Sequence, residues 1–378
     1  MRFAAALSEH PDTASAAGEV AGQVLEALGG PTDLVLLFVT SHHGSALAEV
    51  GQVVRRTLAP STLVGCAAVS VLANGREVEE APAISLWAGS VGTVAPVRII
   101  PGVALAEPAF APSALVVLGD PFSFPADDVF DEVARRWPGL PVVGGMASAA
   151  RRPGGTRLLL DDEVHDAGAV GVFLGPGVEV ETVVSQGCRP IGRPYAVTRA
   201  DVNVVHELAG RPPIERLVDI AQNELTESEV AILNHGGLHV GRVIDEHKTD
   251  FGRGDFLVRN LIGVDQQEGW IAIGDTVEVG TTLQYHLRDA ESADDDLRAM
   301  LTGRRAEGAL VFTCNGRGSH LFGEPDHDAK VLAEYLGAPP TGGFFAAGEF
   351  GPVGGRNFLH GFTASVALLR PAKVGSGA

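Results

Sequence analysis

The chain is short of cysteine and of long apolar runs. Its three cysteines, Cys66, Cys188 and Cys314, are too few for a disulfide framework and lack the paired spacing of a zinc site. No run approaches the ~20 consecutive apolar residues that a transmembrane helix needs. The apolar stretch at residues 3–7 is shorter than the apolar region of a signal peptide. We therefore expect a cytoplasmic protein with no membrane partner.

Basic residues are also scarce. Lys and Arg total 28 against 47 Asp and Glu, which gives a formal net charge of −19. Such a charge repels phosphate backbones and anionic lipids unless a basic patch intervenes. The arginine pairs at 55–56, 135–136, 151–152 and 304–305 are isolated from one another and are typical of solvated helix ends or loops. Nucleic acid is therefore not an expected partner.

What remains is the composition of an ordinary globular protein. The chain has 378 residues, of which 45% are hydrophobic and 20% charged, so it can bury enough apolar surface to fold. This length suits two domains. We place the boundary after the turn-forming stretch at 210–213, which predicts one domain at residues 1–215 and a second at residues 216–378.

A weak internal repeat runs through the sequence. Three segments share the order apolar strand, polar loop, helix and second apolar strand that ends in small residues. The first strands are predicted at 34–39, 114–118 and 309–312, the helices at 46–58, 126–136 and 327–336, and the second strands at 63–66, 141–145 and 340–343. Later strands are predicted at 83–88, 169–174 and 363–369. These elements predict an α+β fold of two mixed α/β domains, with mixed sheets covered by helices.

A different region lies between the second and third repeats, at about 185–303. Its patterns predict helices at 202–208 and 213–225 and strands at 256–262, 270–273 and 281–287.

Several passages of this chain resemble the FIST family, named after F-box and intracellular signal transduction proteins. The most specific are Cys-Asn-Gly-Arg-Gly-Ser-His-Leu-Phe-Gly at 314–323, Gly-Gly-Phe-Phe-Ala-Ala-Gly-Glu-Phe-Gly at 342–351 and Asn-Phe-Leu-His-Gly at 357–361. Ser-His-His at 41–43, Leu-Val-Gly-Cys at 63–66 and Gly-Cys-Arg-Pro-Ile-Gly at 187–192 extend the resemblance to nearly the whole chain.

The resemblance implies a sensory domain that binds small ligands such as amino acids, and that works with signalling output modules. The chain has no room for such an output, so a separate signalling protein is an expected partner. Nothing before Leu34 is long enough for an F-box, and the ubiquitin-ligase adaptor role of eukaryotic relatives is not expected.

The loop of Cys314, Asn315, Gly316 and Arg317 directly follows a predicted buried strand. Its glycine lets backbone N–H groups approach an anion, and an arginine can bind a carboxylate through two parallel hydrogen bonds. We therefore predict ligand contacts at all four residues. The alternative is a tight turn whose arginine pairs with Glu349 or with an aspartate.

A second glycine-rich loop holds Glu349 and Asn357. A carboxylate there suits the ammonium group of a ligand, and the amide suits its orientation, so that with Arg317 the site would bind both ends of a zwitterion. The alternative is an ordinary hairpin loop with a local ion pair.

His42 ends the first predicted strand and is a further candidate ligand contact. Adjacent histidines on an extended segment point to opposite sides, so His42 and His43 do not form a metal pair, and no metal or cofactor is expected. Cys314 as a nucleophile needs a base, for which His320 and His360 are the nearest candidates. The leading hypothesis is thus a small-molecule sensing module rather than an enzyme, and the alternatives are a cysteine-dependent enzyme on a small metabolite and a protein-interaction scaffold.

Overall fold

The computed structural model of the chain describes residues 1–372. The chain divides into two compact units: the first comprises residues 1–184 and the chain from residue 297 onward, and the second comprises residues 185–296. The boundary expected near Glu215 lies inside the second unit, in helix α4 (Pro213–Asn223). One boundary cannot describe an inserted unit, which begins and ends within the chain.

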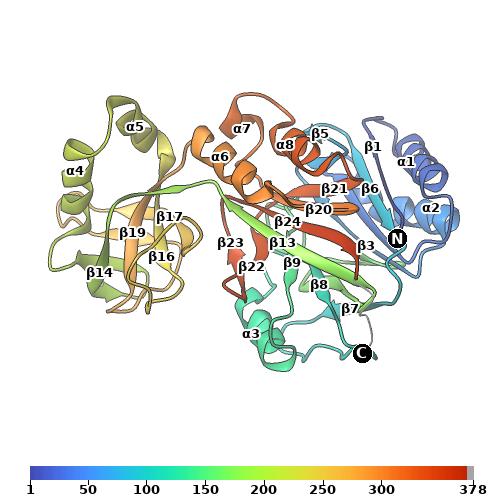
Figure 1. The fold of residues 1–378 in the computed structure, drawn as a ribbon, viewed down its shortest axis with the longest axis horizontal. Coiled ribbons are helices and arrows are strands. Elements are labelled where there is room, and N and C mark those ends of the chain that lie inside the picture. The colour runs from blue at the N-terminus through green and yellow to red at the C-terminus, as the bar shows by residue number, and fades with distance from the viewer. Residues whose placement is uncertain (373–378) are drawn as a thin grey trace. The chain divides into compact units, whose positions relative to one another are not determined.

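The first unit contains three six-stranded sheets, ordered β1-β6-β2-β3-β10-β11, β7-β12-β8-β9-β22-β23 and β13-β24-β20-β21-β4-β5 (Figure 1). The first sheet comprises β1 (Phe3–Ser8), β6 (Ile84–Gly89), β2 (Leu34–Thr40), β3 (Thr62–Ala68), β10 (Leu158–Leu160) and β11 (Glu163–His165). The second comprises β7 (Val94–Ile99), β12 (Ala169–Leu174), β8 (Ala114–Gly119), β9 (Val142–Met146), β22 (Glu349–Val353) and β23 (Arg356–His360). The third comprises β13 (Val178–Gln186), β24 (Thr363–Pro371), β20 (Gly308–Cys314), β21 (Thr341–Ala346), β4 (Val71–Ala73) and β5 (Arg76–Val78).

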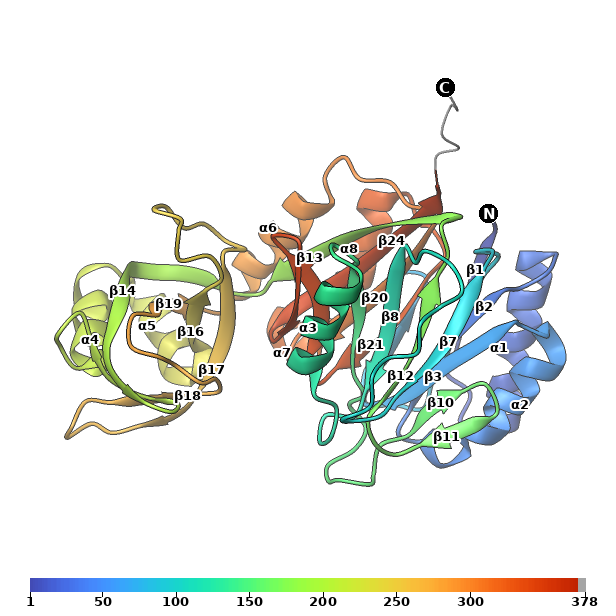
Figure 2. The ribbon, with the colours of Figure 1, turned by 90° about the horizontal axis from the view of Figure 1, so that it is seen from below.

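The three sheets follow one plan. Each centres on a parallel pair joined by a helical crossover, namely β2 with β3, β8 with β9, and β20 with β21. An antiparallel strand flanks the first member of each pair: β6, β12 and β24. The repeats predicted from the sequence are therefore three copies of one strand–helix–strand unit (Figure 2).

The repeats also exchange hairpins. The hairpin β4-β5 follows β3 but pairs with β21 of the third sheet. The hairpin β10-β11 follows β9 but pairs with β3, and β22-β23 follows β21 but pairs with β9. The hairpin of each repeat thus completes the sheet of another repeat, and the three exchanges form a closed ring. The first unit is therefore held together as one folded body, although the barrel interrupts its chain.

Alternation of side chains along the central strands divides the core into layers. On β2, Leu36 and Phe38 face a core shared by all three sheets, whereas Leu37 and Val39 face helices. Phe38, Phe312 and Phe344 meet in the shared core, with ring centroids 5.1 and 5.6 Å apart for the two pairs that contain Phe344.

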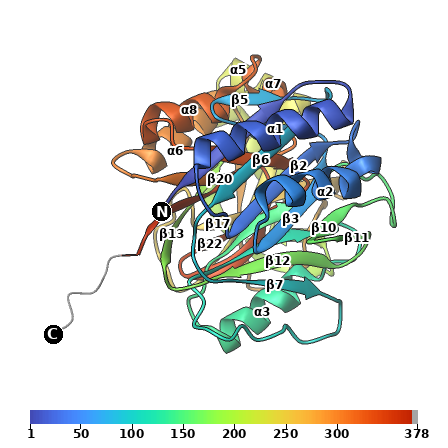
Figure 3. The ribbon, with the colours of Figure 1, turned by 90° about the vertical axis from the view of Figure 1, so that its right-hand side faces the viewer.

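Helices cover the outer faces of the sheets. The first sheet packs on α1 (Thr13–Leu28) and α2 (Leu47–Leu58), and the second on α3 (Ala126–Arg136). The third packs on α8 (His327–Leu336) and on the end of α6 (Ala290–Leu301) (Figure 3). The predicted α+β class with helix-covered mixed sheets is confirmed.

Glycines let the parallel strands approach closely. A Cβ atom at Gly144 would lie 1.8 Å from the carbonyl oxygen of Val117, and one at Gly343 would lie 1.9 Å from that of Val311. No real side chain tolerates such distances, so the small residues that end the second strands serve close packing.

The second unit is a closed six-stranded barrel of order β14-β15-β18-β17-β16-β19. Its strands are β14 (Arg189–Asp201), β15 (Val204–Leu208), β18 (Ile271–Ile273), β17 (Phe256–Val264), β16 (Leu238–Val243) and β19 (Thr282–Leu287). Helix α4, helix α5 (Glu227–Ile232) and the π-helical turn η2 (Leu233–Gly237) connect β15 to β16.

The helix expected at residues 202–208 is wrong, because this segment forms β15. Val204 and Val205 pair with Ala272 and Ile271 of β18. Two adjacent β-branched residues favour a strand, and the short apolar pattern alone did not distinguish the two. The other strands and the helix predicted in this region are present, to within two residues at their ends.

No helix within residues 1–372 has the length and apolar character needed to cross a membrane.

Candidate functional site

The predicted loop lies where β20 ends, at the carboxyl edge of the parallel pair β20-β21. Open α/β sheets bind ligands at this edge. Cys314 pairs with Ala346, and the Asn315 N–H donates to the Ala346 carbonyl (2.9 Å). Cys314, Asn315 and Gly316 are half-buried, whereas Arg317 beneath them is fully buried. The loop therefore offers a partly accessible surface above a buried cation.

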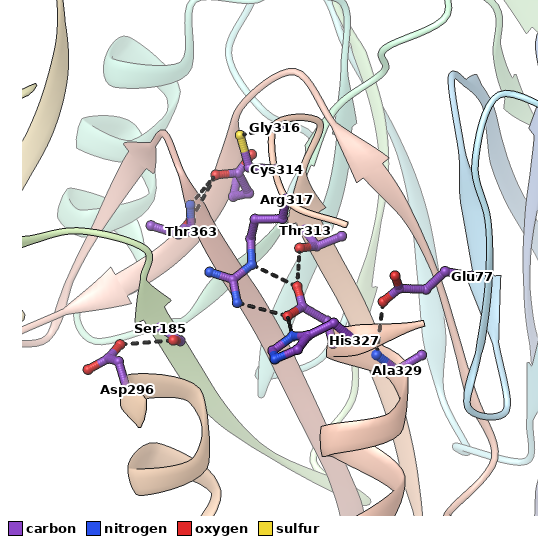
Figure 4. A network of polar contacts seen from close by, with 12 residues as sticks. Glu77, Ser185, Asp296, Thr313, Cys314, Gly316, Arg317, His327, Ala329 and Thr363 are labelled. Carbon is purple, nitrogen blue, oxygen red and sulfur yellow. Dashed lines mark hydrogen bonds and ion pairs between the residues drawn. The ribbon is translucent and has the colours of Figure 1, made fainter. Parts of the chain in front are cut away.

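Arg317 binds an aspartate of the chain itself. Its Nε donates to Oδ2 of Asp328 (2.7 Å) and its Nη2 to Oδ1 (2.8 Å) (Figure 4). Thr313 and His327 also contact the Asp328 carboxylate, at 2.6 and 3.0 Å. Of the two sequence interpretations of Arg317, the pairing with an aspartate is the one observed, and the two-bond grip is not available for a ligand carboxylate.

Both members of this pair are charged. Burial opposes ionisation of Asp328, but the charge and hydrogen bonds of Arg317, with those of His327 and Thr313, hold the pKa of Asp328 well below its usual range. Burial likewise opposes protonation of Arg317, yet Asp328 raises the pKa of the guanidinium. A buried pair of this kind loses most when only one partner is removed.

The third guanidinium nitrogen of Arg317 does not take part in this pair. Among residues 1–372, Nη1 of Arg317 and Oδ1 of Asn315 are shielded from solvent and have no hydrogen-bond partner. Figure 4 shows this nitrogen on the side of Arg317 away from Glu77. A buried donor and a buried acceptor two residues apart are unusual in a native protein, where such atoms are nearly always paired.

The hairpin β4-β5 closes the other side of the network. Glu77 Oε1 accepts the Ala329 N–H in the first turn of α8 (2.9 Å). Glu79 accepts from the backbone N–H (2.9 Å) and the hydroxyl (2.6 Å) of Ser319, where the short helix α7 (Ser319–Phe322) begins. Two carboxylates from the N-terminal part of the chain thus hold both helices that follow the candidate loop.

Glu77 is buried among other acids. Burial, and then the negative charge of Asp328, raise the pKa of Glu77 to about 8. Glu77 therefore holds a proton at neutral pH, beside an ion pair that stays charged.

The remaining predicted residues fall into separate places. Glu349 is fully buried, and its Oε2 accepts the backbone N–H (3.1 Å) and hydroxyl (2.8 Å) of Thr363, the first residue of β24. Because Ala364 pairs with Thr313, this places Glu349 at the same edge as the loop. The amide of Asn357 instead clamps the start of β9, through the Val142 N–H (2.8 Å) and the Leu140 carbonyl (2.9 Å).

Asn357 therefore has no free amide group for orienting a ligand, and the predicted two-ended zwitterion site is not assembled from these side chains. On the hairpin β22-β23, Asn357 pairs with Pro352, which lies three residues after Glu349 on β22. At the rise of an extended strand this separation is about 10 Å.

The two histidines named as candidate bases lie on different elements, His320 exposed on α7 and His360 buried on β23. His360 has Nε2 2.9 Å from the Gly351 carbonyl, and since a carbonyl only accepts, this nitrogen is the proton donor rather than a base. Cys314 Sγ accepts the Gly316 N–H (3.5 Å). His42 is exposed at the end of β2, while His43 is buried against the Thr13 hydroxyl (2.9 Å).

Within the part of the chain that the structure describes, no group of three or more His, Cys, Asp and Glu residues is placed to hold a metal ion.

Comparison with known proteins shows the family of the chain. The FIST N domain pattern matches residues 33–211 and the FIST C domain pattern matches residues 215–352. The chain belongs to the FIST family. Its FIST domains are regarded as sensory domains of signal transduction. The two family patterns meet between residues 211 and 215, inside the barrel.

Relatives cover nearly the whole chain. An uncharacterized protein of Mycobacterium bovis is 44% identical over 386 residues, which span 98% of this chain and 99% of the relative. An uncharacterized protein of Mycobacterium tuberculosis is 43% identical over 385 residues, which span 98% of this chain and 100% of the relative.

Sequence reasoning missed the residues that surround Arg317. Asp328 was detectable, since an acidic residue opens the predicted helix at 327–336 and lies 11 positions after Arg317. Glu77 and Glu79 gave no such signal, because they lie some 240 positions away and reach the loop only through hairpin exchange.

Proposed function

We propose that this FIST protein is a small-molecule sensing module whose ligand binds at the Cys314–Gly316 loop, above Arg317. One observation carries the proposal: Nη1 of Arg317 and Oδ1 of Asn315 lack partners within residues 1–372. An unpaired buried polar group costs about 1–3 kcal/mol. A ligand that supplies an acceptor to the first atom and a donor to the second relieves both costs.

These two contacts define the chemistry of the ligand. Nη1 of Arg317 requires an oxygen acceptor, and Oδ1 of Asn315 requires an N–H or O–H donor. An amino acid carries both groups. Because the atoms are covered, the ligand enters by displacing the half-buried residues 314–316, and Gly316 provides the backbone freedom for this movement.

A thermal-shift screen of the purified chain against amino acids and related metabolites tests the proposal. A ligand at ~100 times its dissociation constant adds about 2.7 kcal/mol of stability. Asn315→Ala removes the unpaired acceptor without leaving a buried charge, so we expect a folded variant that no longer responds.

Asn260→Ala is the matched control, because Asn260 is an exposed amide on the barrel. It should respond like the wild type. Silence across the panel, or a shift that survives Asn315→Ala, contradicts the proposed site.

A further inference from the structure

The barrel holds a large share of the exposed aliphatic side chains of the described residues. Of the ten exposed large apolar residues among residues 1–372, five lie in residues 185–296, which is less than a third of the chain. Val202, Val279 and Ile262 are the three most exposed of the ten, at 66%, 64% and 61%, and Val264, also in the barrel, is 51% exposed. We call these four residues the aliphatic patch.

Backbone contacts gather the patch around one loop, residues 274–281. The Val202 carbonyl accepts the Val277 N–H (2.8 Å), two residues before Val279. On the other side, Cγ2 of Ile262 lies 4.0 Å from the position of a Cβ atom at Gly274. Val264 continues the same strand, β17. Val202 and Ile262 thus adjoin the loop that carries Val279, and Val264 lies two residues from Ile262 on β17.

Val202 occupies a position that neither the backbone conformation nor burial favours. It occupies the two-residue turn between β14 and β15 with φ of 53°. A β-branched residue is strained in this left-handed region, and glycine or asparagine is usual in such hairpin turns. Since its side chain is two-thirds exposed, the position is explained by what the side chain presents to solvent.

Acidic residues adjoin the patch. Asp201 precedes Val202, Glu278 precedes Val279 and Asp265 follows Val264. Asp201 and Glu278 make no ion pair with any described residue. Residues 185–296 together hold 20 acidic and 10 basic residues. A negative rim repels a second copy of this chain and anionic lipid surfaces, and attracts a positively charged partner.

We propose that the aliphatic patch is a docking surface for a protein segment that carries aliphatic side chains between lysines or arginines. The aliphatic side chains of that segment would remove the patch from water, and its basic residues would pair with the acidic rim. This inference is independent of ligand binding at the Cys314–Gly316 loop, because it uses only residues of the barrel.

Fluorescence anisotropy with synthetic peptides tests the docking surface. The probe is a labelled peptide of the sequence Lys-Val-Lys-Leu-Lys-Val-Lys. One control peptide replaces every aliphatic residue with serine, and another replaces every lysine with glutamate. We expect the wild-type chain to bind the probe at least about tenfold more tightly than either control, a difference of about 1.4 kcal/mol.

Variants of the full chain separate the patch from general charge attraction. Val202→Asn suits the left-handed turn, so the chain should keep or raise its melting temperature while its affinity for the probe falls about tenfold. Ile262→Asn should act in the same direction. Val103→Asn alters a side chain that is 58% exposed in the first unit and should leave binding unchanged.

Equal binding of the probe and the serine peptide would overturn the proposal, because attraction would then be purely electrostatic. Unchanged binding in Val202→Asn and Ile262→Asn would overturn it as well. A concentration-dependent dimer of the wild type that Val202→Asn dissociates would show that a second copy covers the patch.

Discussion

The two units use side chains of opposite character at their surfaces and interiors. The three-sheet unit encloses an ion pair, Arg317 with Asp328, and a protonated carboxyl group, Glu77. The barrel encloses neutral histidines, His239 and His286, and exposes the aliphatic patch. The first unit thus buries charge at its candidate ligand site, whereas the barrel buries a pair of neutral histidines and exposes aliphatic side chains.

The largest expected difference concerns a single arginine in each unit. Arg317→Ala leaves Asp328 charged and buried, and such a loss costs about 3–5 kcal/mol of unfolding free energy. Arg211 of the barrel pairs with Glu215 and Asp219 at the surface, and Arg211→Ala should cost less than about 1 kcal/mol. Urea unfolding followed by intrinsic fluorescence measures both.

The double variant Arg317→Met with Asp328→Leu removes both charges and should recover much of the loss. If Arg317→Ala alone costs no more than Arg211→Ala, the buried pair does not organise the first unit.

Acid should weaken the barrel. His239 and His286 lie directly opposite each other on β16 and β19, and burial lowers the pKa of each to about 4. Because this pKa lies below the ordinary value of 6.5, the folded barrel binds fewer protons than the unfolded chain between about pH 4 and pH 6.5. Its stability is full above pH 6.5 and falls as the pH drops towards 4, by up to about 2 kcal/mol per histidine between pH 6.5 and 5.

The stability of the first unit should change with pH in the opposite direction. The folded pKa of Glu77, about 8, lies above its ordinary value of 4.5, so the folded state keeps a proton that the unfolded chain has lost. This contribution is present below pH 4.5 and is lost as the pH rises towards 8, by about 2 kcal/mol over the interval from pH 5 to 6.5.

Hydrogen exchange measures the pH dependence of stability in each unit separately, when it is followed peptide by peptide and corrected for the intrinsic rate at each pH. We expect β16 and β19 to gain protection from pH 5 to 6.5 while β20 loses it. Glu77→Gln should reduce the pH dependence of protection in β20 only. If protection changed with pH in the same direction in both units, the contrast in buried charge would be refuted.

The last comparison concerns glycines in strands. Gly144→Ala places a methyl group against the Val117 carbonyl of the neighbouring parallel strand and should cost at least about 1–3 kcal/mol. At Gly263 of the barrel a Cβ atom would lie 3.5 Å from the nearest side-chain carbon, so Gly263→Ala should change stability by less than about 0.5 kcal/mol. Thermal unfolding compares the two, and equal effects would show that close strand approach is not special to the first unit.

Local patterns predicted the repeats because each strand–helix–strand unit is contiguous. The helices at 126–136 and 327–336 and the strand at 169–174 have the expected bounds. The hairpin exchange was not predictable, since β4 pairs with β21 across some 270 positions. The sequence of a short apolar strand does not indicate which strand it pairs with. For the same reason the sequence did not show that residues 185–296 form an inserted barrel.

The candidate site divides in the same way. The loop at 314–317 was predicted as a ligand site because its glycine and arginine follow a buried strand. The interactions that hold this loop were not predicted, because they are made by Asp328, Glu77 and Glu79, which lie on other elements. Asn357 was assigned to a ligand although its amide holds Val142 and Leu140, since residue type alone does not reveal whether a polar group is already satisfied.

Hydrogen–deuterium exchange of the full chain, with and without a saturating hit from the amino-acid and metabolite screen, is the most direct test of the sensing proposal. We expect slower exchange at residues 314–318 and in the first turns of α7 and α8, with the barrel unchanged. Protection confined to the barrel, or none at residues 314–318, would contradict the claim that the ligand binds above Arg317.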